Sequence, residues 1–244
     1  MKLSGRRIVI TGASRGLGRA LARRFARDGA SLALCSRDGR ALKVVAEELK
    51  EIGSKVLWKE CDVGNSRAVG AFASDVLDEF DSVDVLVNNA SAIAPRKNIS
   101  EYSVAEWNEI IRVNINGLFY VVRSFLPGMM KKKSGMIINV SSSVGRAPRA
   151  QWGAYSVSKF GLEGFTLLLA EELKPYAISV NSVNPGPMAT EMRRIVHPEE
   201  NQDLLNKPEM LTDLFVYLAS GDGAGISGQQ FDATKYIAQP QEKP

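Results

Sequence analysis

Cysteine and histidine are scarce in this sequence of 244 residues, which contains two cysteines and one histidine. Cys35 and Cys61 each end an apolar run, and His197 lies alone in a stretch without clear periodicity. No cluster of Cys and His side chains offers a set of metal ligands. We therefore expect two buried core thiols, with a redox pair or a metal site as the weaker alternative, a solvated histidine and no bound metal.

Long apolar runs are also absent. No stretch of about 18 uncharged apolar residues occurs, and a membrane-spanning helix needs one. The first residues, Met1–Arg7, lead straight into a strand-like segment without the apolar region of a signal peptide. These features predict a cytoplasmic protein that does not bind membranes.

An excess of charge of one sign is missing too, because 31 basic residues are nearly balanced by 27 acidic ones, which leaves a net charge of +4. The one basic run, Lys131–Lys133, falls where a long helix is expected to end, and cations there suit the helix dipole. A charge this mild and dispersed gives no indication of a nucleic-acid partner.

Short β-rich runs alternate with helical patterns along the chain, which is typical of a parallel sheet covered by helices on both faces. We expect an α/β fold with one doubly wound, Rossmann-type domain over residues 1–244. Residues 187–208 break the rhythm and are interpreted as a substrate loop or lid, and the tail 239–244 is expected to be unstructured. The predicted strands are Arg7–Thr11, Ser31–Ser36, Lys55–Glu60, Val83–Val87, Gly135–Ser141 and Ile178–Asn184, and the predicted helices are Leu17–Asp28, Arg40–Ile52, Arg67–Phe80, Val104–Lys131 and Ala154–Leu173.

A glycine-rich turn joins the first expected strand to the first helix. Gly12, Gly16 and Gly18 give the spacing Gly-x-x-x-Gly-x-Gly. Glycine lets a phosphate approach the main chain, and the amides at the helix start attract its charge. The turn therefore indicates a dinucleotide site, although three glycines could also be purely structural.

The end of the second expected strand carries Ser36 and Arg37, where an acidic residue would hold the ribose of NAD. Arginine binds a phosphate with two parallel hydrogen bonds, and Arg15 in the glycine turn adds a second cation. We therefore predict NADP(H) over NAD(H). The alternative is that Arg37 faces solvent while Asp38 caps the next helix.

Tyr155 and Lys159 are four residues apart on an expected helix and share one face. A neighbouring ammonium favours the phenolate and should lower the pKa of the phenol. Such a phenol can exchange a proton with an oxygen that changes between carbonyl and alcohol, while the hydroxyl of Ser142 holds that oxygen. The spacing alone is also common in ordinary amphipathic helices.

The ordered set of motifs resembles the short-chain dehydrogenase/reductase family from Arg7 to about Phe231. The resemblance implies catalysis by Asn114, Ser142, Tyr155 and Lys159, with Asn114 holding a water that links Lys159 to solvent. It also implies, together with the phosphate-binding arguments above, a cofactor site made of Gly12, Ser14, Arg15, Gly16, Leu17, Gly18, Ser36, Arg37, Asp62, Val63, Asn89, Ala90, Tyr155, Lys159, Pro185, Gly186 and Thr190.

Two positions depart from the family pattern. Ser91 stands where the family has a glycine beside the cofactor, and the segment after Gln230 lacks the usual closing Gly-Gly. The first departure could alter the local turn. The second puts the form of assembly in doubt more than the chemistry.

The substrate side is expected to include Ser142, Val144, Trp152 and Met188, which favour a hydrophobic carbonyl compound. Several basic residues lie near them in the sequence, namely Arg96, Lys97, Arg146, Arg149, Arg193 and Arg194. They raise the hypothesis of an acidic substrate such as an acyl thioester, as in the family's 3-oxoacyl-carrier-protein reductases. Scattered surface charge is the favoured alternative.

The combined prediction is an NADPH-dependent reductase of a small carbonyl compound, with Tyr155 as the proton donor. The resemblance implies a homotetramer or homodimer in which the helices carrying Asn114 and Tyr155 pack against their copies. The rival hypothesis is a catalytically silent NADP-binding regulator or scaffold of the same fold.

Overall fold

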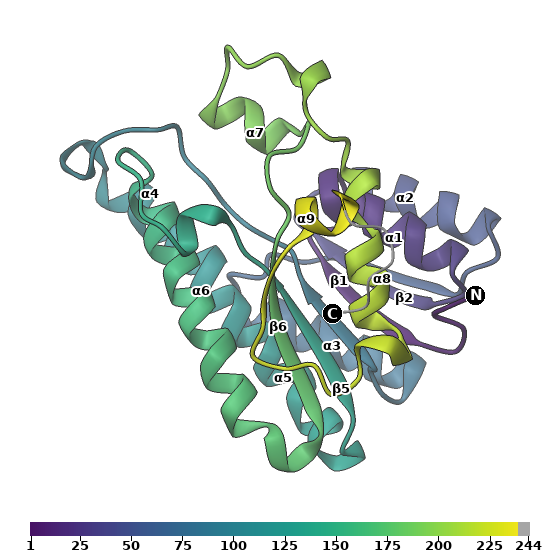
Figure 1. Cartoon of the computed structure of the whole chain (residues 1–244). Coiled ribbons are helices and arrows are strands. Elements are labelled where there is room, and N and C mark those ends of the chain that lie inside the picture. Colours follow the sequence, from purple (N-terminus) through teal and green to yellow (C-terminus); the bar gives the residue numbers. More distant parts are fainter. Residues whose placement is uncertain (239–244) are drawn as a thin grey trace.

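The computed structural model describes residues 1–238, and the expected unstructured tail at 239–244 lies outside the described residues. Seven parallel strands form one sheet in the order β3-β2-β1-β4-β5-β6-β7 (Figure 1). The strands are β1 (Arg7–Thr11), β2 (Ser31–Ser36), β3 (Val56–Glu60), β4 (Val85–Asn88), β5 (Gly135–Val140), β6 (Ile178–Asn184) and β7 (Gln230–Asp232). This order confirms the doubly wound Rossmann-type fold. That residues 1–244 form one domain stays a prediction, and the single sheet supports it.

Helices cover both faces of the sheet, and each face has its own apolar core (Figure 1). On one face pack α1 (Gly16–Arg27), α2 (Gly39–Glu51) and α8 (Asp213–Ala219), and on the other α3 (Ser66–Phe80), α5 (Gly117–Lys132) and α6 (Gly153–Glu172). The inner strands are apolar nearly throughout because both of their faces are buried. The remaining helices are α4 (Val104–Ile111), α7 (Glu191–Val196) and α9 (Ala233–Ala238).

The strand order reverses between β1 and β4, which lie side by side although two strands separate them in the chain. The connections leaving β1 and β4 therefore run to opposite sides of the sheet. A crevice opens at such a point, beyond the carboxyl ends of the strands, and ligands of this fold class bind there.

The expected helix over 104–131 forms as one continuous run of helical backbone, but not as one regular α-helix. Helix α4 ends at Ile111, a π-helical turn runs from Arg112 to Asn116, and α5 begins at Gly117. A Cβ atom on Gly117 would lie 2.9 Å from Cγ2 of Val63. The loop after β3 therefore packs closely against the start of α5. Single π-turns often mark functional sites, and this one turns Asn114 inward to 3% exposure.

The segment 187–208 contains the short helix α7 and a 3-10 turn, Gln202–Leu204, within otherwise irregular chain. Thr190 caps α7 by accepting a hydrogen bond from the backbone N of Arg193 at 3.2 Å. The segment returns on itself, since Ala189 N donates to Asn206 O at 3.0 Å. Figure 1 shows α7 standing above the rest of the fold, at the side where the crevice opens.

Candidate active site

A cleft of about 880 Å³ lies at the carboxyl ends of the strands, where the sheet order reverses. It is walled by the turn after β1, the ends of β2 and β4, helix α6 and the chain from Pro185 through α7. The predicted cofactor residues in its lining are Gly12, Ser14, Arg15, Gly16, Leu17, Ser36, Arg37, Val63, Asn89, Ala90, Tyr155, Lys159, Pro185 and Thr190. The predicted residues Gly18, Asp62 and Gly186 are not part of this lining.

The glycine turn forms one wall of the cleft. Gly12 has a φ of +66°, and a Cβ atom on it would come 2.9 Å from Cα of Ala90. The amide of Asn89 closes the turn by donating to the carbonyl oxygens of Thr11 at 2.9 Å and Gly12 at 3.1 Å. Within residues 1–238 no side chain caps the N-terminus of α1, so its first amides are available to an anion.

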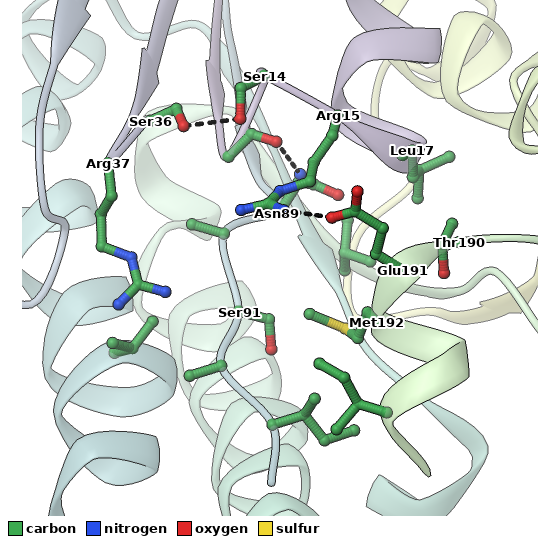
Figure 2. A pocket seen from close by; sticks show the side chains of 18 of the residues that line it. Ser14, Arg15, Leu17, Ser36, Arg37, Asn89, Ser91, Thr190, Glu191 and Met192 are labelled. Carbon is green, nitrogen blue, oxygen red and sulfur yellow. Dashed lines mark hydrogen bonds and ion pairs between the residues drawn. The ribbon is translucent and has the colours of Figure 1, made fainter. Parts of the chain in front are cut away.

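Two cations lie along the same wall, and each is paired with a carboxylate. Figure 2 shows the pair of Arg15 with Glu191. Arg37 Nη1 lies 3.1 Å from Oε1 of Glu109, and Arg15 pairs with Glu191 at the start of α7. The four side chains are between 43% and 66% exposed, so these pairs are worth only about 0–1 kcal/mol each. A phosphate in the cleft can therefore displace either carboxylate.

The two sequence interpretations of the Ser36–Arg37 segment do not exclude each other. Asp38 caps α2 by accepting from the backbone N of Ala41 at 3.0 Å, and Arg37 still lines the cleft. The hydroxyl of Ser36 donates to that of Ser14 at 2.8 Å, which fixes the glycine turn to the end of β2 (Figure 2).

The Asp62 side chain is occupied by protein groups. It accepts from the backbone N of Gly64 at 2.9 Å and pairs with Arg112 at 2.8 Å. Burial alone would raise the pKa of Asp62, but these two contacts outweigh burial and lower it. Its neighbour Val63 is the residue of this motif that lines the cleft.

Of the predicted catalytic residues, Tyr155 and Lys159 line the cleft, and Ser142 hydrogen-bonds Tyr155. Ser142 follows β5 and begins a short turn, while Tyr155 and Lys159 lie on consecutive turns of α6. Tyr155 is 8% exposed and Lys159 is 3% exposed. The Nζ atom of Lys159 donates to the carbonyl of Val140 at 2.8 Å and lies 5.5 Å from the centre of the Tyr155 ring.

The expected lowering of the phenol pKa is wrong for this arrangement. Burial raises the pKa of Tyr155 to about 12, and the hydrogen bond with Ser142 lowers it only in part. Burial also lowers the pKa of Lys159 to about 8, against the opposing charge of Glu163. Desolvation thus dominates the pKa values of both groups, and the Lys159 ammonium is held by the Val140 carbonyl.

Asn114 links three segments around the site. Its Oδ1 accepts from Ala92 N at 2.7 Å and from the Ser91 hydroxyl at 3.2 Å. Its Nδ2 donates to Ala92 O at 3.0 Å and to the Ser158 hydroxyl at 2.9 Å. These four bonds use the full capacity of the amide, so any water held by Asn114 has only the backbone to bind. Ser91, where the family has glycine, thus gains a defined partner.

An aromatic and aliphatic cluster covers Tyr155. Trp152 packs with its ring centre 5.8 Å from that of Tyr155, and Val144, Val196 and Ile93 complete the cluster. The predicted substrate residues Val144 and Trp152 are therefore placed beside the phenol, and Met188 lines the cleft. The expectation of a solvated His197 holds in part: the residue is half-buried, its ring packs 5.9 Å from that of Trp152, and burial lowers its pKa.

The hypothesis that Arg146 binds an acidic substrate is also wrong. Its guanidinium lies behind the site, where Nε donates to Glu163 at 2.9 Å and Nη1 to Asp232 at 3.2 Å. Arg193 pairs with Glu200 at 2.5 Å. Of the basic residues considered for substrate binding, Arg194 is the one in the cleft lining.

Sequence reasoning missed the acidic partners of the two cofactor-side arginines. Glu109 and Glu191 both line the cleft. Glu109 sits in an ordinary amphipathic helix pattern and gives no signal. Glu191 directly follows the predicted Thr190, which is the one hint that it lies near the cofactor site.

Comparison with known proteins agrees with this geometry. The family described as short chain dehydrogenase matches residues 6–201. An uncharacterized Escherichia coli oxidoreductase, YciK, is 34% identical over 99% of this chain and 95% of its own, and its structure superimposes with a TM-score of 0.91 over 95% of this chain and 96% of its own. A 3-oxoacyl-[acyl-carrier-protein] reductase of Aquifex aeolicus is 32% identical over 94% of this chain and 96% of its own.

A structure from Escherichia coli CFT073, solved in complex with NADPH, is 34% identical and has a TM-score of 0.91 over 95% of this chain and 98% of its own. Family match, relatives and fold agree with the motifs in the sequence. The chain belongs to the short-chain dehydrogenase/reductase family of oxidoreductases.

Proposed function

We propose that this oxidoreductase uses NADP(H) to reduce a carbonyl to an alcohol, with Tyr155 as the proton donor. The observation that carries the proposal is that Tyr155, in contact with both Ser142 and Lys159, lines the same cleft as the glycine turn that suits a dinucleotide. A panel of ketones, quinones, sugars and acetoacetyl thioesters, followed by NADPH absorbance, tests it. A protein that oxidises NADPH with none of them contradicts it.

The residues of the site fit a bound nicotinamide dinucleotide. The free amides at the start of α1 and the cradle at Gly12 suit the pyrophosphate, and Thr190 and Pro185 line the other end of the cleft. When bound, the cofactor supplies the hydride. The polypeptide orients the two reactants, excludes water and moves the proton.

Each catalytic side chain has a distinct task in reduction. The hydroxyl of Ser142 holds the carbonyl oxygen, and the phenol of Tyr155 gives that oxygen its proton. Lys159 carries the positive charge that stabilises the phenolate left behind. With a pKa of about 8, Lys159 keeps much of this charge at neutral pH and loses it in alkali.

The choice of NADP(H) rests on Arg37 and Arg15, which line the cleft beside Ser36. We expect Arg37→Ala to weaken NADPH binding by about tenfold or more, because a charge-assisted phosphate contact is worth about 1.5–3 kcal/mol. NADH binding should change less than about twofold. Fluorescence titration of both cofactors measures this.

Glu109→Gln is the matched control for the arginine variant. It frees Arg37 from its ion pair, and we expect NADPH to bind a few times more tightly, by up to about fivefold. Tighter binding of NADH than of NADPH by the unaltered protein contradicts the cofactor assignment.

The substrate end of the cleft favours an apolar carbonyl compound. Ile93, Met188, Met192 and Ile195 line it, and Trp152 packs on Tyr155. Relatives that include a 3-oxoacyl-[acyl-carrier-protein] reductase support an acyl thioester as one candidate within this class. Arg194 is the cation available to an anionic end of such a substrate.

We also propose a homo-oligomer, a dimer or tetramer, that forms through the outer faces of α5 and α6. Large apolar side chains are 42–53% exposed there, and those on α6 follow helical spacing; they are Phe119, Val157, Phe160, Leu167 and Leu168. Clustered exposed apolar residues typically mark interfaces.

The double variant Phe160→Glu/Leu168→Glu is expected to yield monomers, because each carboxylate must be desolvated if the interface forms. Light scattering coupled to size exclusion measures the mass. Val44→Glu, on α2 and 54% exposed, is the control and should leave the mass unchanged. A monomeric parent protein contradicts the assembly.

A further inference from the structure

A buried polar network lies directly behind the catalytic residues. At its centre is Glu163 on α6, one helical turn beyond Lys159 and 4% exposed. Four donors converge on its carboxylate: the hydroxyl of Ser141 at 2.5 Å, Nε of Arg146 at 2.9 Å, the hydroxyl of Ser182 at 2.6 Å and the side-chain amide of Gln230 at 3.0 Å. An ionised carboxylate accepts hydrogen bonds and donates none, so this set of donors suits it.

The network holds both sides of the short turn that carries Ser142. Ser141 precedes that residue and Arg146 follows the turn, and both donate to the same oxygen, Oε1 of Glu163. The turn also packs tightly on the helix, because a Cβ atom on Gly145 would lie 2.7 Å from Cβ of Lys159. The position of Ser142 relative to α6 is therefore set by Glu163.

The network continues to the cofactor end of the cleft. Arg146 donates to Asp232 on β7 at 3.2 Å, and Asp232 accepts from the side chain of Asn184 at 2.7 Å. Asn184 in turn accepts from the backbone N of Gly186 at 3.1 Å, beside Pro185 in the cleft wall. One set of buried contacts thus joins the Ser142 turn to the segment at the nicotinamide end.

We propose that Glu163 and Arg146, which both lie behind the cleft lining, are positioning residues of the active site. Their ion pair fixes the Ser142 turn against α6, and Glu163 supplies the negative charge that Lys159 faces. This role rests on the proposed carbonyl chemistry. It concerns two residues that are outside the cleft lining.

The electrostatic part follows from the charges around Lys159. The groups that face it are Tyr155 and Glu163 on α6 and, through Glu163, Arg146 after β5 and Asp232 on β7. Burial lowers the pKa of Lys159 to about 8, and the Glu163 carboxylate works against that lowering. Without this carboxylate, Lys159 should lose its proton at a lower pH.

The first test measures Lys159 directly, by NMR titration of protein labelled with ¹³C-lysine and complexed with NADP⁺, with the signal assigned from Lys159→Arg. We expect Glu163→Gln to lower the Lys159 pKa by about one unit. Arg146→Lys keeps the charge and should leave the pKa within about 0.3 units of the parent value.

Thr166→Val is the matched control for a purely structural effect. Thr166 is buried on the same helix and accepts from Asn139 at 2.9 Å, so its loss disturbs α6 without changing charge. We expect it to lower thermal stability and to leave the Lys159 pKa unchanged. Equal Lys159 pKa values in the parent, Glu163→Gln and Thr166→Val proteins overturn the electrostatic part of the proposal.

The second test measures positioning with Ser141→Ala, which keeps every charge and serves also if Glu163→Gln does not fold. We expect kcat for carbonyl reduction to fall about tenfold, with KM for NADPH within about threefold, because a small misplacement of Ser142 weakens transition-state contacts. Ser182→Ala removes a donor to the other carboxylate oxygen and should cost less. An unchanged kcat in Ser141→Ala overturns the positioning part.

These tests separate this inference from the proposed function. If the parent protein reduces no carbonyl compound, the proposed reductase activity fails, while the NMR titration still decides whether Glu163 sets the charge of Lys159. If the parent is active and neither test shows the expected change, only the positioning role fails.

Discussion

Tyr155→Phe is expected to lower kcat for carbonyl reduction by about 10³-fold while NADPH binds with nearly unchanged affinity, because the phenol hydrogen-bonds Ser142 and is placed to give the proton. Burial holds the pKa of Tyr155 at about 12, so the phenol is protonated over the whole working range and ready to give its proton. Steady-state kinetics with NADPH and fluorescence titration of the cofactor separate the two effects.

Tyr120→Phe is the control, since Tyr120 lies on α5 and does not line the cleft; it should keep full activity. The same experiment addresses the rival hypothesis of a silent NADP-binding regulator. A Tyr155→Phe protein that oxidises NADPH as fast as its parent would remove Tyr155 from the mechanism. A parent that binds NADPH and never turns over would favour the regulator.

The sheet could be predicted from the sequence because its strands are buried on both faces. Short, continuous apolar runs such as Ile8–Ile10, separated by helical patterns, are typical of strands in the interior of a parallel sheet. The errors are small and lie at strand ends, where β3 begins at Val56 instead of Lys55 and β4 runs Val85–Asn88 instead of Val83–Val87. The short β7 pairs by only three residues, too few for a pattern.

The π-helical turn that joins α4 to α5 could not be predicted, because no local residue pattern marks it. Pro127, the residue that most favours a break, lies inside α5 without ending it. The π-helical turn is stabilised by contacts between distant segments, namely Gly117 against Val63 and Asn114 against Ala92. Such contacts leave no periodic trace in the sequence.

The same distinction holds within the active site. Spacing along one helix reveals Tyr155 and Lys159, and a strand followed by glycines reveals the phosphate turn. The partners of Arg146 are 17 and 86 residues away, at Glu163 and Asp232, so the sequence could not show that its charge is already used. Burial, which dominates the pKa values of Tyr155 and Lys159, also becomes visible only in the fold.

Gly18→Ala is expected to raise the Kd for NADPH by about 100-fold and to lower the free energy of unfolding by about 2–3 kcal/mol. A Cβ atom on Gly18 would lie 2.3 Å from the carbonyl oxygen of Gly12 and 2.6 Å from Nδ2 of Asn89. The first contact is with backbone, so the glycine turn itself must move. The contact with Asn89 displaces the side-chain amide that donates to the carbonyl oxygens of Thr11 and Gly12 and so closes the turn.

Gly70→Ala is the matched control, because Gly70 lies within α3 with no atom within 4 Å of a Cβ placed there. Alanine favours a helix over glycine by about 1 kcal/mol, so this variant should be slightly more stable and bind NADPH normally. Isothermal calorimetry and thermal unfolding compare the two. If Gly18→Ala binds NADPH as Gly70→Ala does, the turn yields without losing its amides, and the phosphate site must then depend on Arg15 and Arg37 and not on the backbone cradle.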